Sequence, residues 1–585
     1  MRIGLLTEGG YPYATGESAL WCDRLVRGLA PHTFDVYALT GDAGQEPAGR
    51  LPLPPHVRAV RTAALGDAEG EGPGGRGGRS DRCGYGRRER QRFEAAFADL
   101  AYGVCAGDAD TGAGPHADAA ERFAAGLYAL AELARAHGGL SAALRSETAV
   151  RVLESACRAP GARRTLAAAT LPDQLAVVAR WERLLRPLSL DWYDTSDGLG
   201  RVDLCHAASA GAAALPGLVA KRFFGTPLLV TEHGSRLRAH YLATTGAPFT
   251  TPVRALLAAF HGRLAGEAYR RADLLTPGNA HTRRWQERCG ADPDRLRTVH
   301  PGMDAERFAE TGEHEDSGDP ATLAWIGRVE PAKDLVALLH AFAAIRRRQP
   351  DVQLRIIAAP VRDADAAGYL ALCRSLAAQL FPAEAAGAHA VGESPVSFEE
   401  LGSPEAPTLE DAYAASAVVV LSSVAEGFPV GLVEAMFCAR ATVSTDVGAV
   451  VEVVGGTGLV VPPRNPTALA DACLALLRDP GRRHRLGAAA RARALELFTV
   501  EQNLAAYRGL YLELLSHAPV RHRAAPGVPF AHPAESHVPG GWADRPAAGP
   551  AAPATSAPVT AAHTTSAPVT ATATTVAAAP GDADA

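Results

Sequence analysis

Lysine is scarce in this chain, and its cysteines are few and scattered. The 585 residues include nine cysteines, and none of them forms a C-x-x-C pair. A disulfide framework or a cysteine-based zinc site is therefore not expected, and reduced thiols are the simplest interpretation. No apolar run reaches the roughly 18 residues of a membrane span, and the run at 3–6 is too short for a signal-peptide core. We therefore expect a protein that works in the cytoplasm.

The bulk composition is that of a globular protein with more than one domain. Apolar residues make up 47% and charged residues 21% of the chain, and its 585 residues are too many for one hydrophobic core. The net charge of -6 is small for this length and no basic stripe is present, so we expect no nucleic-acid partner. From residue 517 on, alanine, proline, threonine and glycine dominate, which predicts a disordered tail at 517–585.

The first part of the chain alternates between strand-like and helix-like patterns. Apolar runs at 3–6 and 34–39 predict strands, and the helical spacing of 19–29 between them predicts a parallel α/β unit. The glycine- and arginine-rich residues 66–92 predict a disordered insertion. Alanine-rich helical spacing at about 119–187 predicts a helical insertion in the same domain.

The same alternation starts again after the polar residues 311–320, which we interpret as an interdomain linker. We therefore predict an α/β protein with two Rossmann-like, doubly wound domains, at 1–310 and 320–495, that face a ligand-binding cleft. A further helix is predicted at 496–516, packing back toward the first domain.

An apolar run near the end of the second domain leads into the polar turn EGFP, which opens a helix. Ligand-binding loops of α/β sheets lie at the carboxyl ends of strands, as this turn does. Glu426 and Glu434 are eight residues apart, about two helical turns, so both carboxylates can face one side if the helix covers most of the spacing. Taken alone, the pair could equally be a helix cap and a solvated carboxylate.

The loop GRVEPAKD at 327–334 follows the first predicted strand of the second domain. Its Arg328 and Lys333 would lie at the mouth of the cleft, where a planar fork and a point charge can neutralise a diphosphate. It is not a P-loop, because G-x-x-x-x-G-K-[ST] does not occur in the chain. The alternative is two solvated basic residues beside a helix cap.

The first domain contributes a glycine loop and a histidine. Gly9, Gly10 and Gly16 allow a backbone to approach a phosphate closely, although they could also form a tight turn. His233 follows the apolar run PLLV at 227–230 and the residues Thr231 and Glu232, so we expect its side chain to point into the cleft. His206 ends another predicted strand and is a weaker candidate.

Together these residues resemble the GT-B-fold, retaining glycosyltransferases of family 4. The resemblance is carried by GRVEPAKD, by the two glutamates within EGFPVGLVEAM, and by TDVGAVVEVV at 445–454. The first domain is similar to the branch that contains the Pel exopolysaccharide glycosyltransferase. Its matching segments are LLTEGGYPY at 5–13, LCHA at 204–207, LLVTEHG at 228–234 and NAHTRRWQERCGADPDRLRTVHPGMDAERF at 279–308.

The resemblance implies roles for individual residues. Arg328 and Lys333 would hold the donor's diphosphate, Glu434 the ribose hydroxyls, and Glu426 the donor sugar. His233 would contact the sugar or the leaving phosphate, which makes it the fourth candidate catalytic residue beside Glu426, Arg328 and Lys333. The segment from Val396 to Phe398 would approach the base. The whole implied donor site comprises Gly327, Arg328, Lys333, Val396, Phe398, Glu426, Gly427, Phe428 and Glu434.

The implied activity is the transfer of a sugar to a polysaccharide or glycoconjugate acceptor with retention. UDP-glucose is the favoured donor, and GDP-mannose and UDP-N-acetylglucosamine are the alternatives. No metal or other cofactor is required in such enzymes. A peripheral membrane partner in a polysaccharide synthesis complex would place the protein at the inner face of the membrane. The alternatives are a UDP-sugar epimerase or phosphorylase of the same architecture, and a non-catalytic sugar-nucleotide-binding scaffold subunit. Glu17 departs from the family's Gly-Gly-Val-type loop by adding a negative charge on the acceptor side.

Overall fold

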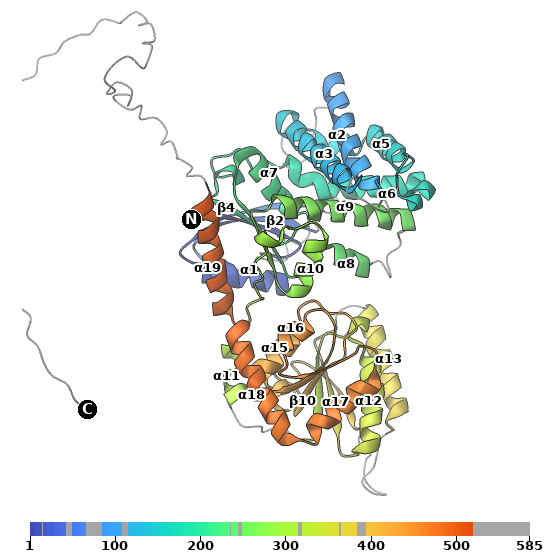
Figure 1. The fold of residues 1–585 in the computed structure, drawn as a ribbon, viewed down its shortest axis with the longest axis vertical. Coiled ribbons are helices and arrows are strands. Elements are labelled where there is room, and N and C mark those ends of the chain that lie inside the picture. The colour runs from blue at the N-terminus through green and yellow to red at the C-terminus, as the bar shows by residue number, and fades with distance from the viewer. Residues whose placement is uncertain are drawn as a thin grey trace, which may run out of the picture. The chain divides into compact units, whose positions relative to one another are not determined.

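The computed structural model describes most of the chain up to residue 518. The described residues are 1–13, 16–41, 50–65, 85–107, 115–234, 236–243, 249–313, 319–361, 364–382 and 394–518. They form two parallel sheets of six strands each, with helices packed against both (Figure 1). The prediction of two doubly wound α/β domains is confirmed. The predicted tail from residue 519 on, and residues 66–84 of the predicted disordered insertion, lie outside the described residues.

The first sheet is built from strands that belong to the first half of the chain. They are β1 (Arg2–Glu8), β2 (Thr33–Thr40), β3 (Val57–Ala64), β4 (Leu204–Ala207), β5 (Leu228–Glu232) and β6 (Leu274–Pro277). They pair in the order β3-β2-β1-β4-β5-β6, and each neighbouring pair is parallel. The strand order reverses between β1 and β4, and doubly wound sheets bind ligands beside the carboxyl ends of the strands at such a point.

Two groups of helices accompany this sheet. The helices that alternate with its strands or follow them are α1 (Glu17–Gly28), α7 (Ala214–Phe224), α8 (Arg236–Ala243), α9 (Thr251–Arg271), α10 (Ala280–Arg288) and α11 (Ala309–Glu313). Those inserted between β3 and β4 are α2 (Arg87–Cys105), α3 (Pro115–His137), α4 (Leu140–Leu144), α5 (Glu147–Cys157) and α6 (Leu171–Leu185).

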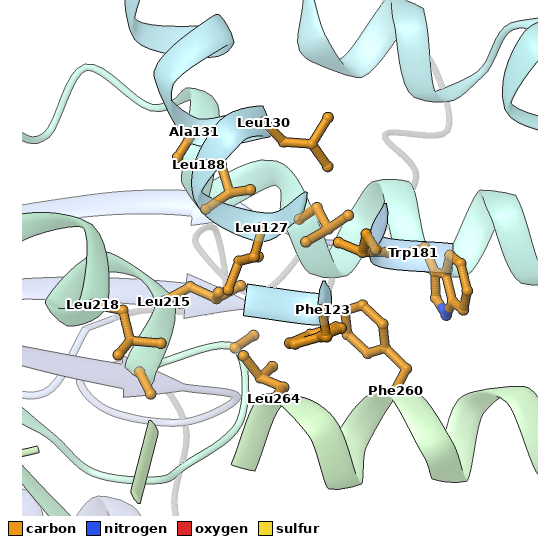
Figure 2. Packing of buried hydrophobic residues seen from close by; sticks show 14 of the residues in the cluster. Phe123, Leu127, Leu130, Ala131, Trp181, Leu188, Leu215, Leu218, Phe260 and Leu264 are labelled. Carbon is orange, nitrogen blue, oxygen red and sulfur yellow. The ribbon is translucent and has the colours of Figure 1, made fainter. Parts of the chain in front are cut away.

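Aromatic side chains join the inserted helices to α9. Phe123 of α3 lies against Phe260 of α9 with 5.9 Å between ring centroids, and Trp181 of α6 stacks on Phe260 at 5.4 Å (Figure 2). All three side chains are fully buried. Large aromatic groups contribute much of the apolar area that a core removes from water, so the insertion shares one core with the sheet-covering helix.

The helical insertion starts earlier than the sequence predicts. The composition indicates disorder through residue 92, and helical spacing only over 119–187, but α2 begins at Arg87. Phe93 and Phe97 stack on each other on the buried face of α2, which explains why this segment is helical. The arginine-rich start of the helix is solvent-facing, so its composition resembles that of a disordered segment.

The second sheet repeats the topology of the first. Its strands are β7 (Thr322–Gly327), β8 (Gln353–Ala358), β9 (Val396–Glu400), β10 (Val418–Leu421), β11 (Ala441–Thr445) and β12 (Leu459–Val461). The order is β12-β11-β10-β7-β8-β9, again with parallel pairs. The helices of this domain are α12 (Leu335–Arg348), α13 (Ala364–Leu380), α14 (Leu409–Ala414), α15 (Val430–Phe437), α16 (Val450–Val454), α17 (Pro466–Leu477) and α18 (Pro480–Leu497). The order reverses between β7 and β10, so the loops that follow these two strands are neighbours.

The last described helix, α19 (Val500–His517), follows the second domain in sequence but packs on the first sheet. Its Tyr511 hydroxyl forms a 2.7 Å hydrogen bond with Nδ1 of His206, whose Nε2 is joined to Thr231 Oγ1 at 2.7 Å. Tyr507 also contacts Thr231, at 3.0 Å. His206 is thus a fully buried member of the contact between sheet and helix, with both ring nitrogens satisfied.

Among the helices of the described residues, none combines the length and the apolar character that a membrane crossing requires.

The contact between α19 and the sheet can be tested with Tyr511→Phe. The change keeps the ring but leaves the buried Nδ1 of His206 without its partner, which should cost about 1–3 kcal/mol of unfolding free energy. Thermal and urea unfolding would measure it. Leu512→Ala, at a position 63% exposed on the same helix, is the matched control and should change stability by no more than about 0.5 kcal/mol. Equal stability of the two variants would contradict the assignment.

Candidate active site

Two loops meet where the second sheet reverses its strand order. One follows β7 and contains Arg328 and Lys333, and the other follows β10 and contains Glu426. The Ser422 hydroxyl donates to the Lys333 carbonyl at 2.7 Å, and the Val424 amide donates to the Ala332 carbonyl at 2.8 Å. Two motifs that are about 90 residues apart in sequence are therefore joined into one structure, as expected from parallel strands with adjacent carboxyl ends.

The Lys333 ammonium group donates to Glu426 Oε1 at 2.5 Å. The Ser423 hydroxyl donates to the same oxygen at 2.7 Å. Only 19% of the Lys333 side chain and 9% of the Glu426 side chain are exposed. The cation and the carboxylate, which the sequence assigns to different parts of a ligand, thus form one partly buried, charge-assisted pair.

Arg328 is placed differently from Lys333. Its side chain is 79% exposed, and it forms an ion pair with Glu330 at 3.5 Å. Such an exposed pair contributes little to stability, so the guanidinium can change partners at small cost. Asp334 closes the loop by accepting the Ala337 amide at 3.2 Å, and α12 starts directly after it, as the sequence predicts.

The two glutamates of the E-x7-E pattern do not lie on one helix. Helix α15 begins only at Val430, with Pro429 as its N-cap, so Glu426 lies in the preceding loop and Glu434 in the second turn. The helix covers the spacing only from Val430 on, because Gly427 and Phe428 lie in the preceding loop. Glu434 instead accepts the Tyr413 hydroxyl at 2.9 Å. The two carboxylates therefore have separate partners.

A third loop, after β11, fixes the backbone at Glu426 and Gly427. Gly448 has a φ of +59, and a Cβ at this position would lie 2.4 Å from the Glu426 carbonyl oxygen. The next amide, of Ala449, donates to the Gly427 carbonyl at 3.1 Å. Only glycine fits here, because the backbones touch and the left-handed conformation is costly for other residues. The sequence contained TDVG as a signal, but its spacing alone did not indicate this role for Gly448.

His233 follows β5 and lines a cavity, as its position at the end of a strand predicts. The cavity measures about 360 Å³, a typical size for a small-ligand site, and residues of both domains line it. The lining residues are Thr7, Glu8, Tyr11, Ser18, Trp21, Cys22, Arg24, Ala208, Ser209, His233, Gly234, Pro301, Gly302, Met303, Phe428 and Val430. Phe428 lines this cavity and belongs to the same loop as Glu426, so the cavity of His233 lies beside the loop that contains the Lys333–Glu426 pair.

The His233 ring is enclosed but has no hydrogen-bond partner on either nitrogen within the described residues. Its edge contacts the Trp21 ring, with 4.9 Å between centroids, and Gly278 leaves room for it, since a Cβ there would lie 2.6 Å from Nδ1. Burial lowers the pKa of His233 to about 4. At neutral pH the ring is uncharged, with one nitrogen able to donate and the other to accept.

The glycine loop is only partly available for a ligand. The Gly9 amide donates to the Leu39 carbonyl at 2.8 Å, so it is already used, and its φ of +77 marks a turn. Gly16 is exposed and precedes α1 as its N-cap. Gly10 has no such bond from its amide among those described, while its carbonyl accepts the Tyr13 amide at 2.8 Å. The tight-turn alternative therefore holds for Gly9, and phosphate binding by Gly10 and Gly16 stays a prediction.

Val396 and Phe398 do not lie at the ligand edge of the sheet. Val396 begins β9, the edge strand, and its side chain is buried; it lies about 13 Å from the carboxyl end of that strand. Phe398 packs beneath the Arg374 guanidinium in the body of the sheet. Leu401 and Gly402 occupy the carboxyl edge instead, with the Leu401 amide bound to the Ala358 carbonyl. The resemblance implies that the backbone of 396–398 approaches the base; these residues lie in the body of the strand, and the contact stays a prediction.

Two family models match the chain. One, described as a domain of unknown function (DUF3492), matches residues 1–294, and the other, glycosyl transferases group 1, matches residues 320–479. The chain belongs to the DUF3492 family, and residues 320–479 are similar to the group 1 glycosyltransferases.

Several curated proteins similar to this chain are named D-inositol 3-phosphate glycosyltransferase. The D-inositol 3-phosphate glycosyltransferase of Kribbella flavida is 32% identical over 233 residues, which cover 37% of this chain and 52% of that protein. The protein of the same name from Nocardioides is 29% identical over 373 residues, which cover 60% of this chain and 74% of that protein. The chain spans about half the length of the first of these relatives and of the Frankia alni protein, at 52% and 50%.

Solved glycosyltransferase structures share the two-sheet architecture. Sucrose-phosphate synthase from Thermosynechococcus elongatus superposes with a TM-score of 0.50 at 16% identity, covering 88% of this chain and 99% of that one. Anabaena HepE in complex with UDP superposes with a TM-score of 0.51 at 13% identity, covering 87% of this chain and 99% of that one. At these identities the likeness concerns the fold alone, and it identifies the two doubly wound sheets as the GT-B fold.

The role of Gly448 can be tested with Gly448→Ala. The added methyl would overlap the Glu426 carbonyl, so the loop must shift. Gly456→Ala is the matched control, because Gly456 also has a positive φ, +87, but faces open space. We expect Gly448→Ala to lose about 1–3 kcal/mol more unfolding free energy than the control. Hydrogen exchange at Gly427 and Phe428 should rise in this variant only. A common loss in both variants would show that backbone conformation, and not the contact, matters.

The enclosed His233 predicts a specific pH dependence of stability. Its pKa is lowered from 6.5 to about 4 in the folded state, so only the unfolded chain takes up a proton as pH falls from 6.5. The stability of the wild type relative to His233→Gln is complete above pH 6.5 and decreases as pH falls toward 4. Between pH 7 and pH 5 this difference should shrink by about 2 kcal/mol in urea unfolding. Parallel pH curves for the two proteins would refute the burial argument.

Proposed function

We propose that the protein transfers a sugar from a nucleotide diphosphate donor to a hydroxyl group of a carbohydrate or glycoconjugate acceptor, with retention of configuration. The observation that carries the proposal is the Lys333 ammonium group, held 2.5 Å from Glu426 at the point where the second sheet reverses its strand order. Arg328 lies in the same loop with an exposed guanidinium. Two cations at this edge match the charge of a diphosphate leaving group.

The Lys333–Glu426 pair suggests how the donor would bind. A diphosphate entering this loop competes with the carboxylate for the ammonium group. Glu426 is then released to accept hydrogen bonds from the hydroxyls of the donor sugar, while Ser423 continues to donate to it. Glu434 of α15 accepts the hydroxyl of Tyr413 of α14, and in this proposal it also binds the ribose. The resulting order is sugar, diphosphate and nucleoside along the carboxyl edge of the second sheet.

The cavity beside His233 is the proposed entry for the acceptor. An uncharged imidazole there can donate a hydrogen bond to a sugar hydroxyl or a phosphate oxygen without repelling the cations of the second domain. The acceptor hydroxyl would attack on the same face of the sugar from which the diphosphate departs. Stabilisation of the developing negative charge by Lys333 and Arg328 is then the main catalytic contribution.

Further details are part of the same proposal. UDP-glucose is the favoured donor, and HepE, which shares the fold, was solved with UDP. We propose that no bound metal takes part, since the two cations of the loop supply the positive charge. Membership of family 4 and of its Pel branch, a polysaccharide product, and a membrane-associated partner are kept as predictions from the motifs.

A non-catalytic sugar-nucleotide-binding subunit is the alternative that one observation favours. A cation already neutralised by a carboxylate, as Lys333 is by Glu426, suits a site that binds a nucleotide sugar without turning it over. A thermal-shift screen of nucleotide sugars, followed by an assay of nucleotide release, separates the two functions. A ligand at 100 times its Kd adds about 2.7 kcal/mol of stability. Binding with slow release of the nucleoside diphosphate supports the transferase, and binding without turnover supports the subunit.

The two cations of the loop after β7, Arg328 and Lys333, should control turnover. We expect Lys333→Ala and Arg328→Ala each to lower kcat/KM by about 10²–10³-fold, because each removes one charge that stabilises the leaving diphosphate. Donor hydrolysis and transfer to an acceptor would be measured on folded protein. Arg347→Ala, an exposed arginine on α12, is the control and should have wild-type activity. A folded Lys333→Ala enzyme that turns over normally is incompatible with the proposed role.

A further inference from the structure

Arg238 connects the first domain to the loop that contains Glu426. It lies on α8, which begins shortly after His233, and its guanidinium donates to the Glu426 carbonyl oxygen at 2.9 Å. The two residues are 188 positions apart in sequence. The contact is made to the backbone, so it constrains the path of the loop and leaves the Glu426 carboxylate to Lys333.

The surroundings of Arg238 make this hydrogen bond a strong one. Burial lowers the pKa of the guanidinium, and the nearby Glu426 carboxylate opposes that shift. Arginine nevertheless remains charged in proteins, so the bond is charge-assisted and lies partly out of water. His281 of α10 lies near the same cation, and its pKa is lowered, first by burial and then by Arg238. The Glu426 carbonyl oxygen therefore accepts a hydrogen bond from a cation that also lies near His281.

The same carbonyl oxygen is restrained from its other side. The Gly448 backbone lies so close that a Cβ there would be 2.4 Å away, and the Ala449 amide holds the Gly427 carbonyl. Helix α16, which follows the loop of Gly448, is tied to the first domain, because the Ala280 amide of α10 donates to Glu452 Oε2 at 2.6 Å. The loop after β10 and the helix after the β11 loop are thus each hydrogen-bonded to the first domain.

We propose that Arg238 is a positioning residue, which holds residues 426–428 in place for the donor by binding the Glu426 carbonyl. The inference rests on the proposed function, and it adds a residue of the first domain to a donor site otherwise built by the second. Arg238 acts on the sugar through Glu426 and does not touch the reacting atoms. Without it the loop gains freedom, the Gly427 and Phe428 amides lose their fixed direction, and the Lys333–Glu426 geometry loosens.

The test compares Arg238→Ala and Arg238→Lys with the wild type. The alanine variant should raise the donor KM by about 10- to 100-fold, as expected for loss of a hydrogen bond from a charged group. A lysine can still donate one hydrogen bond to the carbonyl, so Arg238→Lys should have an intermediate KM. Millimolar guanidinium should restore donor affinity to Arg238→Ala only. Arg288→Ala, an exposed arginine on α10, is the matched control and should have wild-type KM and kcat.

A readout without turnover completes the test. Hydrogen exchange at the Gly427 and Phe428 amides of the ligand-free protein should be faster in Arg238→Ala than in the wild type, with unchanged melting temperature. A wild-type donor KM in Arg238→Ala, or unchanged hydrogen exchange at the two amides, would overturn the inference. A smaller fraction of active enzyme with an unchanged donor KM would also overturn it. If the wild-type protein fails to turn over any nucleotide sugar, the proposed function fails, and the exchange measurement still decides whether Arg238 positions the loop.

Discussion

The reversal of strand order in each parallel sheet is the constraint on which the site depends. The chain builds β1 to β3 outward and returns to β4, and it builds β7 to β9 outward and returns to β10. At each return, two loops leave the sheet side by side with nothing between them. Charged and polar side chains can gather there without interrupting the apolar layers. The Lys333–Glu426 pair and the His233 cavity occupy the two places that this topology provides.

The fold could be predicted from the sequence, because apolar residues recur with the periods of strands and helices. Short apolar runs separated by helical spacing predict doubly wound sheets, and both sheets follow that prediction. Composition misled at the start of α2, where arginines on the exposed turns hide the buried Phe93 and Phe97. A window dominated by glycine and arginine resembles a disordered segment even where the next helical turns enter a core.

The candidate site was predictable only where residues lie at the ends of strands. His233 follows β5 directly, and Lys333 and Glu426 lie in the loops that follow β7 and β10. Val396 and Phe398 belong to the body of a strand, where the pattern does not reveal how far the carboxyl end is. Arg238 and Gly448 act through backbone atoms of a distant loop, a relation that residue type and spacing do not encode.

His206 and His233 show how neighbouring positions acquire different chemistry. They end adjacent strands β4 and β5, and burial lowers the pKa of both rings, to about 3 and about 4. His206 is enclosed by Thr231 and the Tyr511 hydroxyl of α19, whereas His233 faces a cavity. One ring therefore stabilises the fold and the other is available for a ligand, a difference that depends on a helix about 300 residues away.

The return of α19 to the first domain also means that the chain crosses between the domains twice. The two crossing segments run together, since the Met303 amide binds the Phe498 carbonyl at 2.9 Å and the Val500 amide binds the Met303 carbonyl at 3.1 Å. A paired ribbon resists sliding and shear more than a single linker does. The two domains are therefore joined by a hydrogen-bonded pair of chain segments, which ties the residues just before α19 to those just before α11.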